Sequence, residues 1–158
     1  MKAKDQGKLR HLGNSVGNNQ NVKQVEASKK RGLETIQIIY NRLDRAPETT
    51  TFPVCAEQNL GVLARVPLAS GFLSGKYKPG TTFPEGDVRS RWKDRNLDQK
   101  LAEVERIAKE EVPAGVPMAH YALAWCLKNP VVTCVIPGCK SVEQVEDNAK
   151  AAEALAKI

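Results

Sequence analysis

The chain has 158 residues, of which 41% are hydrophobic and 27% charged. These values exclude a disordered tail, a small disulfide-stapled protein and a membrane-spanning protein, and they predict one globular domain over residues 1–158. The net charge of +6 lies entirely in residues 1–31, and the eight aromatic residues are not interleaved with that basic segment, so we do not expect a nucleic-acid partner.

Apolar runs along the chain predict four strands separated by amphipathic helices. The expected strands lie at residues 8–12, 35–40, 60–66 and 131–136, and the last is apolar enough to be covered on both faces. The expected helices lie at residues 21–31, 48–59, around 101–108, 118–127 and 141–156. Strands that alternate with helices are typical of parallel β/α units, so the predicted fold class is α/β.

One long segment, residues 67–96, interrupts this alternation and is rich in Gly and Pro. It contains four basic residues, Arg89, Arg91, Lys93 and Arg95, which we interpret as a solvated loop. Loops of this length in compact domains are usually functional or disordered.

The polar N-terminus and the short apolar runs, such as residues 122–127, predict a cytoplasmic protein without a membrane partner. The four cysteines, Cys55, Cys126, Cys134 and Cys139, form no C-x-x-C pair, so we expect reduced thiols, mostly in the core, and no metal site.

Ligands of parallel β/α folds bind where the strands end, so the residues after each predicted strand are the candidate site. After the fourth strand, Gly138, Lys140 and Ser141 open a helix and can form an anion site. Ser141 with Gln144 three residues later can equally be a capping box, which needs no ligand. Both interpretations stay open on the residues alone.

After the third strand, residues 67–77 offer Ser and Gly amides and the cation Lys76, which suit a pyrophosphate, although a tight turn would also need these glycines. The segment is not a Walker A loop, because only three residues separate Gly71 from Gly75 and Tyr77 stands where Ser or Thr is required. No G-x-G-x-x-G motif occurs.

Four segments together resemble the second half of an aldo-keto reductase. They are GKLRHLGNS at residues 7–15, IQIIYNRLDRAPE at 36–48, LGVLARVPLASGFLSGKY at 60–77 and VIPGCKSVEQVEDN at 135–148. The chain is most similar to bacterial members related to the potassium channel β subunits. The resemblance implies half of an eight-unit (β/α)8 TIM barrel, with the four strands as its fifth to eighth. It also implies NADPH as cofactor and reduction of aldehydes and ketones without a metal.

The resemblance also implies a role for each matching residue. At the nicotinamide carboxamide it places Ser15 and Gln37, and beside the cofactor Tyr40. Along the pyrophosphate it places Pro67, Leu68, Ser70, Gly71 and Lys76; at the 2′-phosphate Gly138, Lys140 and Ser141; and at the adenosine Gln144 and Asn148. A cation at Lys140 favours NADP over NAD, because the extra phosphate requires neutralisation. Val16 stands where the family usually has Asn, and Arg65 is either a ligand contact or a charge at the barrel rim.

The family's catalytic Tyr, Lys, Asp and His belong to its first half, so the resemblance implies that residues 1–158 carry no catalytic residue. Tyr40 is a weak alternative proton donor, and we interpret His11 and His120 as structural. A half-barrel exposes two strand edges, so we expect a homodimer that closes a barrel, with a small carbonyl substrate only if the barrel is complete. A non-catalytic self-associating module, or a fragment without activity, is the alternative.

Overall fold

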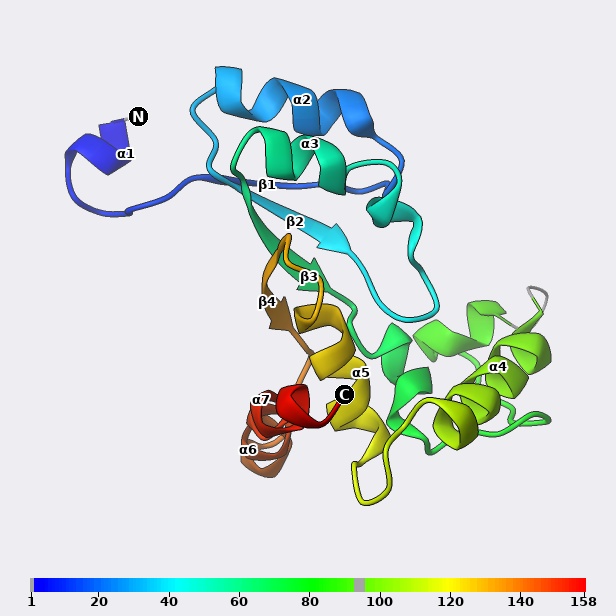
Figure 1. Ribbon diagram of the computed structural model, residues 1–158. Coiled ribbons are helices and arrows are strands. Elements are labelled where there is room, and N and C mark those ends of the chain that lie inside the picture. Colours follow the sequence, from blue (N-terminus) through cyan, green and yellow to red (C-terminus); the bar gives the residue numbers. More distant parts are fainter. Residues whose placement is uncertain (1, 93–95) are drawn as a thin grey trace. The chain divides into compact units, whose positions relative to one another are not determined.

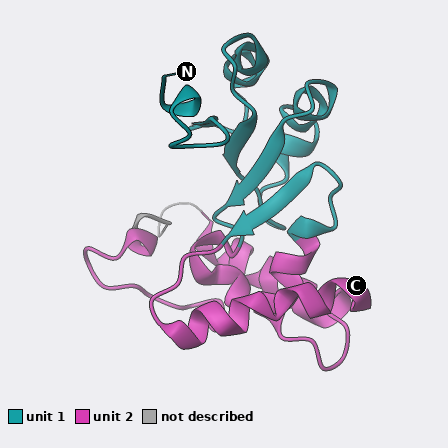
Figure 2. Cartoon of the chain, turned by 90° about the vertical axis from the view of Figure 1, so that its left-hand side faces the viewer, with its two compact units in different colours: residues 1–67, 126–136 teal, residues 68–125, 137–158 magenta. Residues whose placement is uncertain are grey.

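The computed structural model describes residues 2–92 and 96–158, with the backbone alone for Arg91 and Trp92. Figure 2 shows that the chain forms two compact units. Unit 1 consists of residues 1–67 and 126–136, and unit 2 of residues 68–125 and 137–158. That residues 1–158 form a single half-barrel domain stays a prediction.

Unit 1 contains a parallel sheet of four strands, β1 (Gly13–Ser15), β2 (Thr35–Ile39), β3 (Gly61–Arg65) and β4 (Val132–Ile136), shown in Figure 1. The strands are ordered β1-β2-β3-β4, and every neighbouring pair is parallel. This arrangement confirms the predicted α/β class with a parallel sheet. Sequential parallel order is also the order of strands in one half of a β/α barrel.

The first strand does not lie where its sequence pattern predicts. Residues 8–12 form no strand, and β1 begins only at Gly13. Gly13 is paired with Thr35, and a Cβ atom at Gly13 would lie 2.1 Å from the Thr35 Oγ1 atom. Because only glycine permits this approach, the ladder starts at a residue that the apolar pattern treats as a strand terminator.

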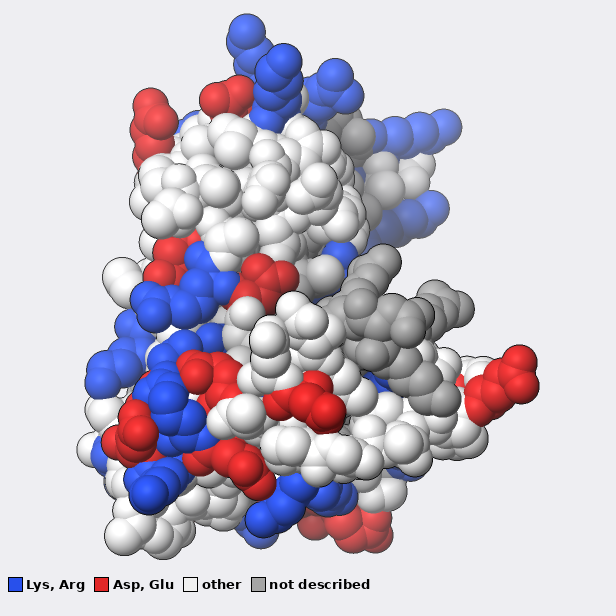
Figure 3. Space-filling model, turned by 90° about the vertical axis from the view of Figure 1, so that its right-hand side faces the viewer, with Lys and Arg blue, Asp and Glu red and all other residues white. Residues whose placement is uncertain are grey.

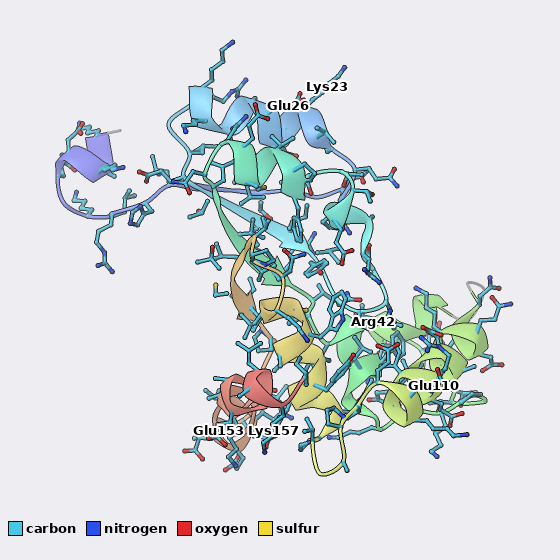
Figure 4. The ribbon with its side chains drawn as sticks, in the orientation of Figure 1. Lys23, Glu26, Arg42, Glu110, Glu153 and Lys157 are labelled. Carbon is cyan, nitrogen blue, oxygen red and sulfur yellow. The ribbon has the colours of Figure 1, made fainter. Side chains whose placement is uncertain are left out.

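The two central strands, β2 and β3, alternate between a buried and a partly exposed face, as the period of two in a strand requires. The fully buried side chains are Ile36, Ile38, Val62 and Ala64. Two helices cover this face, α2 (Val22–Lys30) through Val25 and α3 (Phe52–Glu57) through Phe52 and Cys55. Lys23 and Glu26 project from α2 away from the sheet, as Figure 4 shows.

The helix expected over residues 48–59 is shorter in the structure. A 3₁₀ turn occupies Ala46–Glu48, and α3 begins only at Phe52. Proline lies in the first turn of each element, at Pro47 and Pro53, because its missing N–H costs nothing there and would break a hydrogen bond deeper in a helix. A short helix α1 (Lys2–Asp5) precedes the sheet.

Strand β4 is not covered on both faces, contrary to its continuous apolar sequence. Val132 is buried, whereas Thr133 is exposed and Ile136 is 37% exposed. β4 is also an edge strand, which pairs with β3 alone among the described strands.

Unit 2 is built mainly from helices, α4 (Leu97–Glu110), α5 (Met118–Leu127, whose last two residues belong to unit 1), α6 (Val142–Ala149) and α7 (Ala151–Ala154). Three 3₁₀ helices accompany them, at Ala69–Ser74, Val88–Trp92 and Leu155–Lys157. The helix expected over residues 141–156 is therefore divided near Lys150. In α4, the buried residues Leu97, Leu101, Val104 and Ile107 recur at helical spacing and form one apolar face.

The exposed side of unit 2 carries charges of both signs around α4, where Figure 3 shows basic and acidic side chains interleaved. Arg106 contacts three carboxylates, those of Glu103, Glu110 and Glu111, at 2.7, 2.7 and 2.9 Å. Glu111 also accepts a hydrogen bond of 2.9 Å from the Tyr121 hydroxyl, which joins the end of α4 to α5.

The basic cluster in residues 67–96 is not simply a solvated loop. The Arg89 side chain is only 21% exposed and lies over the rings of Tyr77 and Phe83, at 4.9 and 4.6 Å from their centroids. Its guanidinium also donates two hydrogen bonds to Asp87, of 2.9 and 2.6 Å. Lys93, Arg95 and the side chain of Arg91 lie outside the described part of the chain.

All four cysteines carry free thiols, as expected. Cys55 and Cys126 are buried in the core, and burial raises the pKa of Cys55 to about 11. Cys139 is exposed, so the expectation of a core role does not hold for it. The helices in the described part of the chain are all too short or too polar to span a bilayer.

The close approach at Gly13 gives a test of the sheet register. We expect Gly13→Ala to lower the free energy of unfolding by about 1–3 kcal/mol, because the Thr35 side chain must move and the Thr35 carbonyl oxygen, 3.1 Å from the new Cβ, cannot. Chemical denaturation measures the change. Gly17→Ala is the matched control, since no atom lies within 4 Å of its Cβ position. Equal stability of the two variants would refute the register.

Candidate functional site

The candidate residues divide between the two units, so each group is described by itself. In unit 1, Ser15 and Gln37 are paired across β1 and β2, and the Val16 amide donates a 2.8 Å hydrogen bond to the Gln37 carbonyl. Ser15 is exposed and Gln37 partly exposed, on the face opposite Ile36 and Ile38. The sheet therefore brings together the two side chains that the resemblance assigns to one carboxamide.

Tyr40, immediately after β2, is 1% exposed. Its ring packs against Phe52, and its hydroxyl donates a 2.7 Å hydrogen bond to Glu48 and lies 3.4 Å from the Asn129 amide nitrogen. Burial and the Glu48 carboxylate raise the pKa of Tyr40 far above its usual value. A proton donor works best with a pKa near the working pH, so this hydroxyl is poorly suited to acid catalysis.

The exit from β3 is conformationally strained. Val66 has a φ of 56°, in the left-handed region that a β-branched residue rarely adopts, and Pro67 follows it buried. The Val66 carbonyl accepts a 3.0 Å hydrogen bond from the Asn41 side chain, which is itself 3% exposed. This bond helps to hold the chain direction at the end of the strand.

In unit 2, the segment after Leu68 contains three successive residues with positive φ, Ala69 at 48°, Ser70 at 58° and Gly71 at 90°. The Gly71 amide donates to the Leu68 carbonyl at 2.9 Å, and the Gly71 carbonyl accepts from the Ser74 hydroxyl at 2.6 Å. These bonds form a tight turn, as the structural interpretation of the glycines predicts. Lys76 follows with an exposed side chain.

The start of α6 forms a capping arrangement. The Ser141 hydroxyl oxygen accepts from the Gln144 amide at 3.3 Å, and the Gln144 side-chain oxygen accepts from the Lys140 amide at 2.8 Å. The hydrogen bond with Ser141 is the main cause that lowers the pKa of Glu143. The capping interpretation of Ser141 is therefore realised, and it occupies backbone and hydroxyl groups that an anion would otherwise use.

Three other candidate groups near α6 remain accessible. Gly138 is exposed with no atom within 4 Å of its Cβ position, and the Lys140 side chain is exposed. Asn148 is partly exposed and donates a 3.2 Å hydrogen bond to the Cys139 sulfur. A free cation beside an open glycine can still receive a phosphate at this helix start.

The sequence analysis did not single out Asp87 as a residue near Lys140 and the start of α6. Hydrogen bonds from Arg89 hold the pKa of Asp87 well below its usual range, and Lys140 lowers it further by a smaller amount. The Lys140 ammonium therefore lies within electrostatic reach of a carboxylate from residues 67–96. Only the fold could reveal this, because 53 positions separate the two residues.

Each histidine lies beside a carboxylate. His120 is 7% exposed, and its Nε2 atom lies 3.1 Å from the Asp147 carboxylate, close enough for an ion pair though not aligned for a hydrogen bond. His11 does not lie in a strand and contacts Glu34 at 3.1 Å. Within residues 2–92 and 96–158, no three His, Cys, Asp or Glu side chains are grouped to hold a metal.

Curated relatives share most of this chain. It is 34% identical to an uncharacterized oxidoreductase, YrpG, of Bacillus subtilis and 29% identical to the aldo-keto reductase yakc [NADP(+)] of Schizosaccharomyces pombe, over 93% of the chain in each case. It is 31% identical, over 73% of the chain, to a probable voltage-gated potassium channel subunit beta of Arabidopsis thaliana. The chain spans 45%, 44% and 37% of these proteins, less than half their length.

Solved structures agree in fold. The aldo-keto reductase AKR11C1 of Bacillus halodurans superposes with a TM-score of 0.69 at 31% identity, over 97% of this chain and 48% of that one. The glycerol dehydrogenase AKR11B4 of Gluconobacter oxydans superposes with a TM-score of 0.76 at 27% identity, over 99% and 50%.

The family model of the aldo/keto reductases matches residues 1–157, which is nearly the whole chain. The resemblance noted in the four sequence segments is thereby confirmed. This chain belongs to the aldo/keto reductase family.

Proposed function

We propose that this chain is the NADP(H)-binding half of an aldo-keto reductase, an oxidoreductase that transfers hydride between the nicotinamide and an aldehyde or ketone. The observation that carries the proposal is the family match over residues 1–157 by a chain that spans about half of its relatives. The strand ends, where such folds bind ligands, carry the matching polar residues in the family's order.

The cofactor residues fall into a nicotinamide group in unit 1 and a group for the phosphates and the adenosine. The first comprises Ser15 and Gln37, with Tyr40 beside the cofactor; the second comprises Pro67, Leu68, Ser70, Gly71, Lys76, Gly138, Lys140, Ser141, Gln144 and Asn148, all of them in unit 2 except Pro67. The pairing of Ser15 with Gln37 supports the first group, because a carboxamide needs a donor and an acceptor side by side. Tyr40 contributes by fixing the end of β2 rather than through its buried hydroxyl.

The exposed ammonium of Lys140 supports NADP rather than NAD. A 2′-phosphate adds a doubly charged group, which a cation binds through charge-assisted hydrogen bonds. The name of the Schizosaccharomyces pombe relative includes NADP(+). When bound, the cofactor supplies the hydride; the residues of this chain bind and orient it.

A complete reduction also needs a proton donor beside the carbonyl. Tyr40 is the residue nearest to that role in this sequence, and its raised pKa and its bond to Glu48 oppose it. We therefore propose that residues 1–158 do not reduce carbonyl compounds by themselves and that a complete barrel is required for the substrate.

A self-associating half-barrel is the second candidate, and the open strand edges favour it. Within the described residues, β1 pairs with β2 alone and β4 with β3 alone, so their outer backbone groups can pair with another chain. Two copies would supply eight strands, the number that closes such a barrel. This module would bind a nucleotide or nothing.

The 2′-phosphate assignment is tested by Lys140→Ala. We expect the variant to weaken NADPH binding by about tenfold or more and to leave NADH binding nearly unchanged, because the lost interaction is with the extra phosphate. Titration of cofactor fluorescence gives both dissociation constants. Lys128→Ala is a control with a lysine outside the site. Equal losses for the two cofactors would count against the assignment.

The proposed inactivity is tested by assaying the purified chain for NADPH-dependent reduction of simple aldehydes. We expect no turnover above the buffer rate, since no described residue is suited to donate the proton. A full-length relative assayed in parallel shows that the conditions permit turnover. Robust reduction by this chain would overturn the proposal.

The association proposal is tested by light scattering on the purified chain. We expect twice the mass of one chain, because pairing of the β1 and β4 edges removes two exposed edges from each copy. A well-folded monomer at micromolar concentration would exclude closure by pairing while leaving the cofactor assignment intact.

A further inference from the structure

Helix α6 carries the candidate adenosine residues, yet no apolar face holds it in place. None of its eight residues, all of which the structure describes, is buried. Its valines, Val142 and Val145, are 68% and 55% exposed. The helix that follows, α7, buries Ala151 and Ala154 instead. The rotation of α6 about its own axis therefore depends on polar contacts rather than on burial.

The polar contacts of α6 reach two different parts of unit 2. The Asn148 side chain donates a 3.2 Å hydrogen bond to the Cys139 sulfur, in the segment just before the helix. Asp147 reaches a different helix, α5, where one of its carboxylate oxygens lies 3.1 Å from the Nε2 atom of His120. All four residues belong to unit 2. The contact of Asp147 with His120 thus connects α6 to a buried part of the same unit.

The surroundings of His120 make Asp147 the charge that matters to it. His120 is 7% exposed, and its Nε2 atom is shielded from solvent without a hydrogen bond to any described residue. The sequence of α5, MAHYALAWCL, contains no other charged side chain. A proton on Nε2, in the imidazolium or in one neutral tautomer, is attracted by the carboxylate. The Asp147 side chain is 57% exposed and lies 4.0 Å from Lys150, so solvent and a second cation moderate the attraction.

Asp147 lies next to the part of α6 that carries the candidate residues. Gln144 and Asn148 are four positions apart, so they share one face of the helix. Asp147 is three positions after Gln144 and one before Asn148, which places it on an adjoining strip of the helix surface. A rotation of α6 that separated Asp147 from His120 would turn both candidate residues with it.

We propose that His120 is a positioning residue, which through Asp147 fixes the rotation of α6 that presents Gln144 and Asn148 to the adenosine end of NADPH. His120 acts through Asp147 alone, because its own Nε2 atom is shielded from any ligand. The inference rests on the proposed function for the identity of the ligand. The attachment of α6 to α5 is measurable without a cofactor.

Hydrogen exchange of the α6 amides, followed by NMR on the 158-residue chain without ligand, tests this attachment. Asp147→Asn keeps the size of a half-exposed side chain and removes its charge. We expect the α6 amides to exchange about three- to fivefold faster, the effect of a partly screened ion pair on local opening. His120→Gln should have the same effect. Unchanged exchange in Asp147→Asn would overturn the proposal.

Further variants assign the effect to the pair. Glu146→Gln is the matched control, because it removes the same charge from the neighbouring, exposed position of α6, and it should leave the exchange unchanged. Asp147→Glu retains a carboxylate and should restore most of the protection. The double variant of His120→Gln and Asp147→Asn should lose no more than either single variant. Additive losses, or equal losses in Asp147→Asn and Asp147→Glu, would overturn the pairing.

Calorimetry with adenosine 2′,5′-bisphosphate measures binding at the adenosine end. This probe has the adenosine and the 2′-phosphate of NADPH without the nicotinamide, and its candidate residues, Lys140, Ser141, Gln144 and Asn148, all belong to unit 2, so no completed barrel is required. We expect Asp147→Asn to bind the probe about three- to fivefold more weakly. Removal of a negative charge by itself favours a phosphate ligand, so Glu146→Gln should bind it equally well or more tightly. Faster exchange with unchanged affinity in Asp147→Asn would make the contact merely structural and overturn the proposal.

Two comparisons keep this result separate from the proposed function. Lys140→Ala should weaken binding of the bisphosphate without changing the exchange of α6, as a ligand contact does and a positioning contact does not. If the unaltered chain binds neither the bisphosphate nor NADPH, the proposed function is refuted, and the exchange data alone decide whether His120 fixes α6. Normal binding that Asp147→Asn leaves unchanged refutes the role of His120 alone. Circular dichroism shows whether His120→Gln folds; if it does not, Asp147→Asn decides.

Discussion

The two central strands can bury only one of their faces against the helices of this chain. β2 and β3 direct Ile36, Ile38, Val62 and Ala64 toward α2 and α3, and the period of two then places Gln37, Leu63 and Arg65 on the other face. The core of unit 1 depends on the first set. The candidate chemistry depends on the second, whose side chains are only partly buried.

The helix start at Ser141 shows how a cap can leave a neighbouring charge accessible. Its hydroxyl accepts from the Gln144 amide in the first turn of α6, and the Gln144 side chain accepts from the Lys140 amide just before the helix. The Lys140 ammonium takes no part in this cap and remains exposed. A phosphate at this position would interact mainly with the Lys140 side chain, because the cap already uses the backbone amides at the helix start.

The arginines divide in a similar way. Arg106 and Arg89 are paired within the chain, Arg106 with the carboxylates at the end of α4 and Arg89 with Asp87 while it lies over the rings of Tyr77 and Phe83. The Nε–H group of Arg65 is shielded from solvent and has no acceptor among the described residues. How well a guanidinium is satisfied depends on its partners in the fold, which composition and charge counts do not record.

The sequence by itself determined the α/β class, three of the four strands to within a residue or two, the family and the polar residues at the strand ends, because period, apolar runs and motif order are local properties. The start of β1 required the tertiary structure, since the contact of Gly13 with Thr35 spans distant positions. The same holds for the packing of Arg89, the burial of the Tyr40 hydroxyl and the exposure of Ile136. Each of these depends on which residues become neighbours, and pairing between distant segments leaves no periodic signal in the chain.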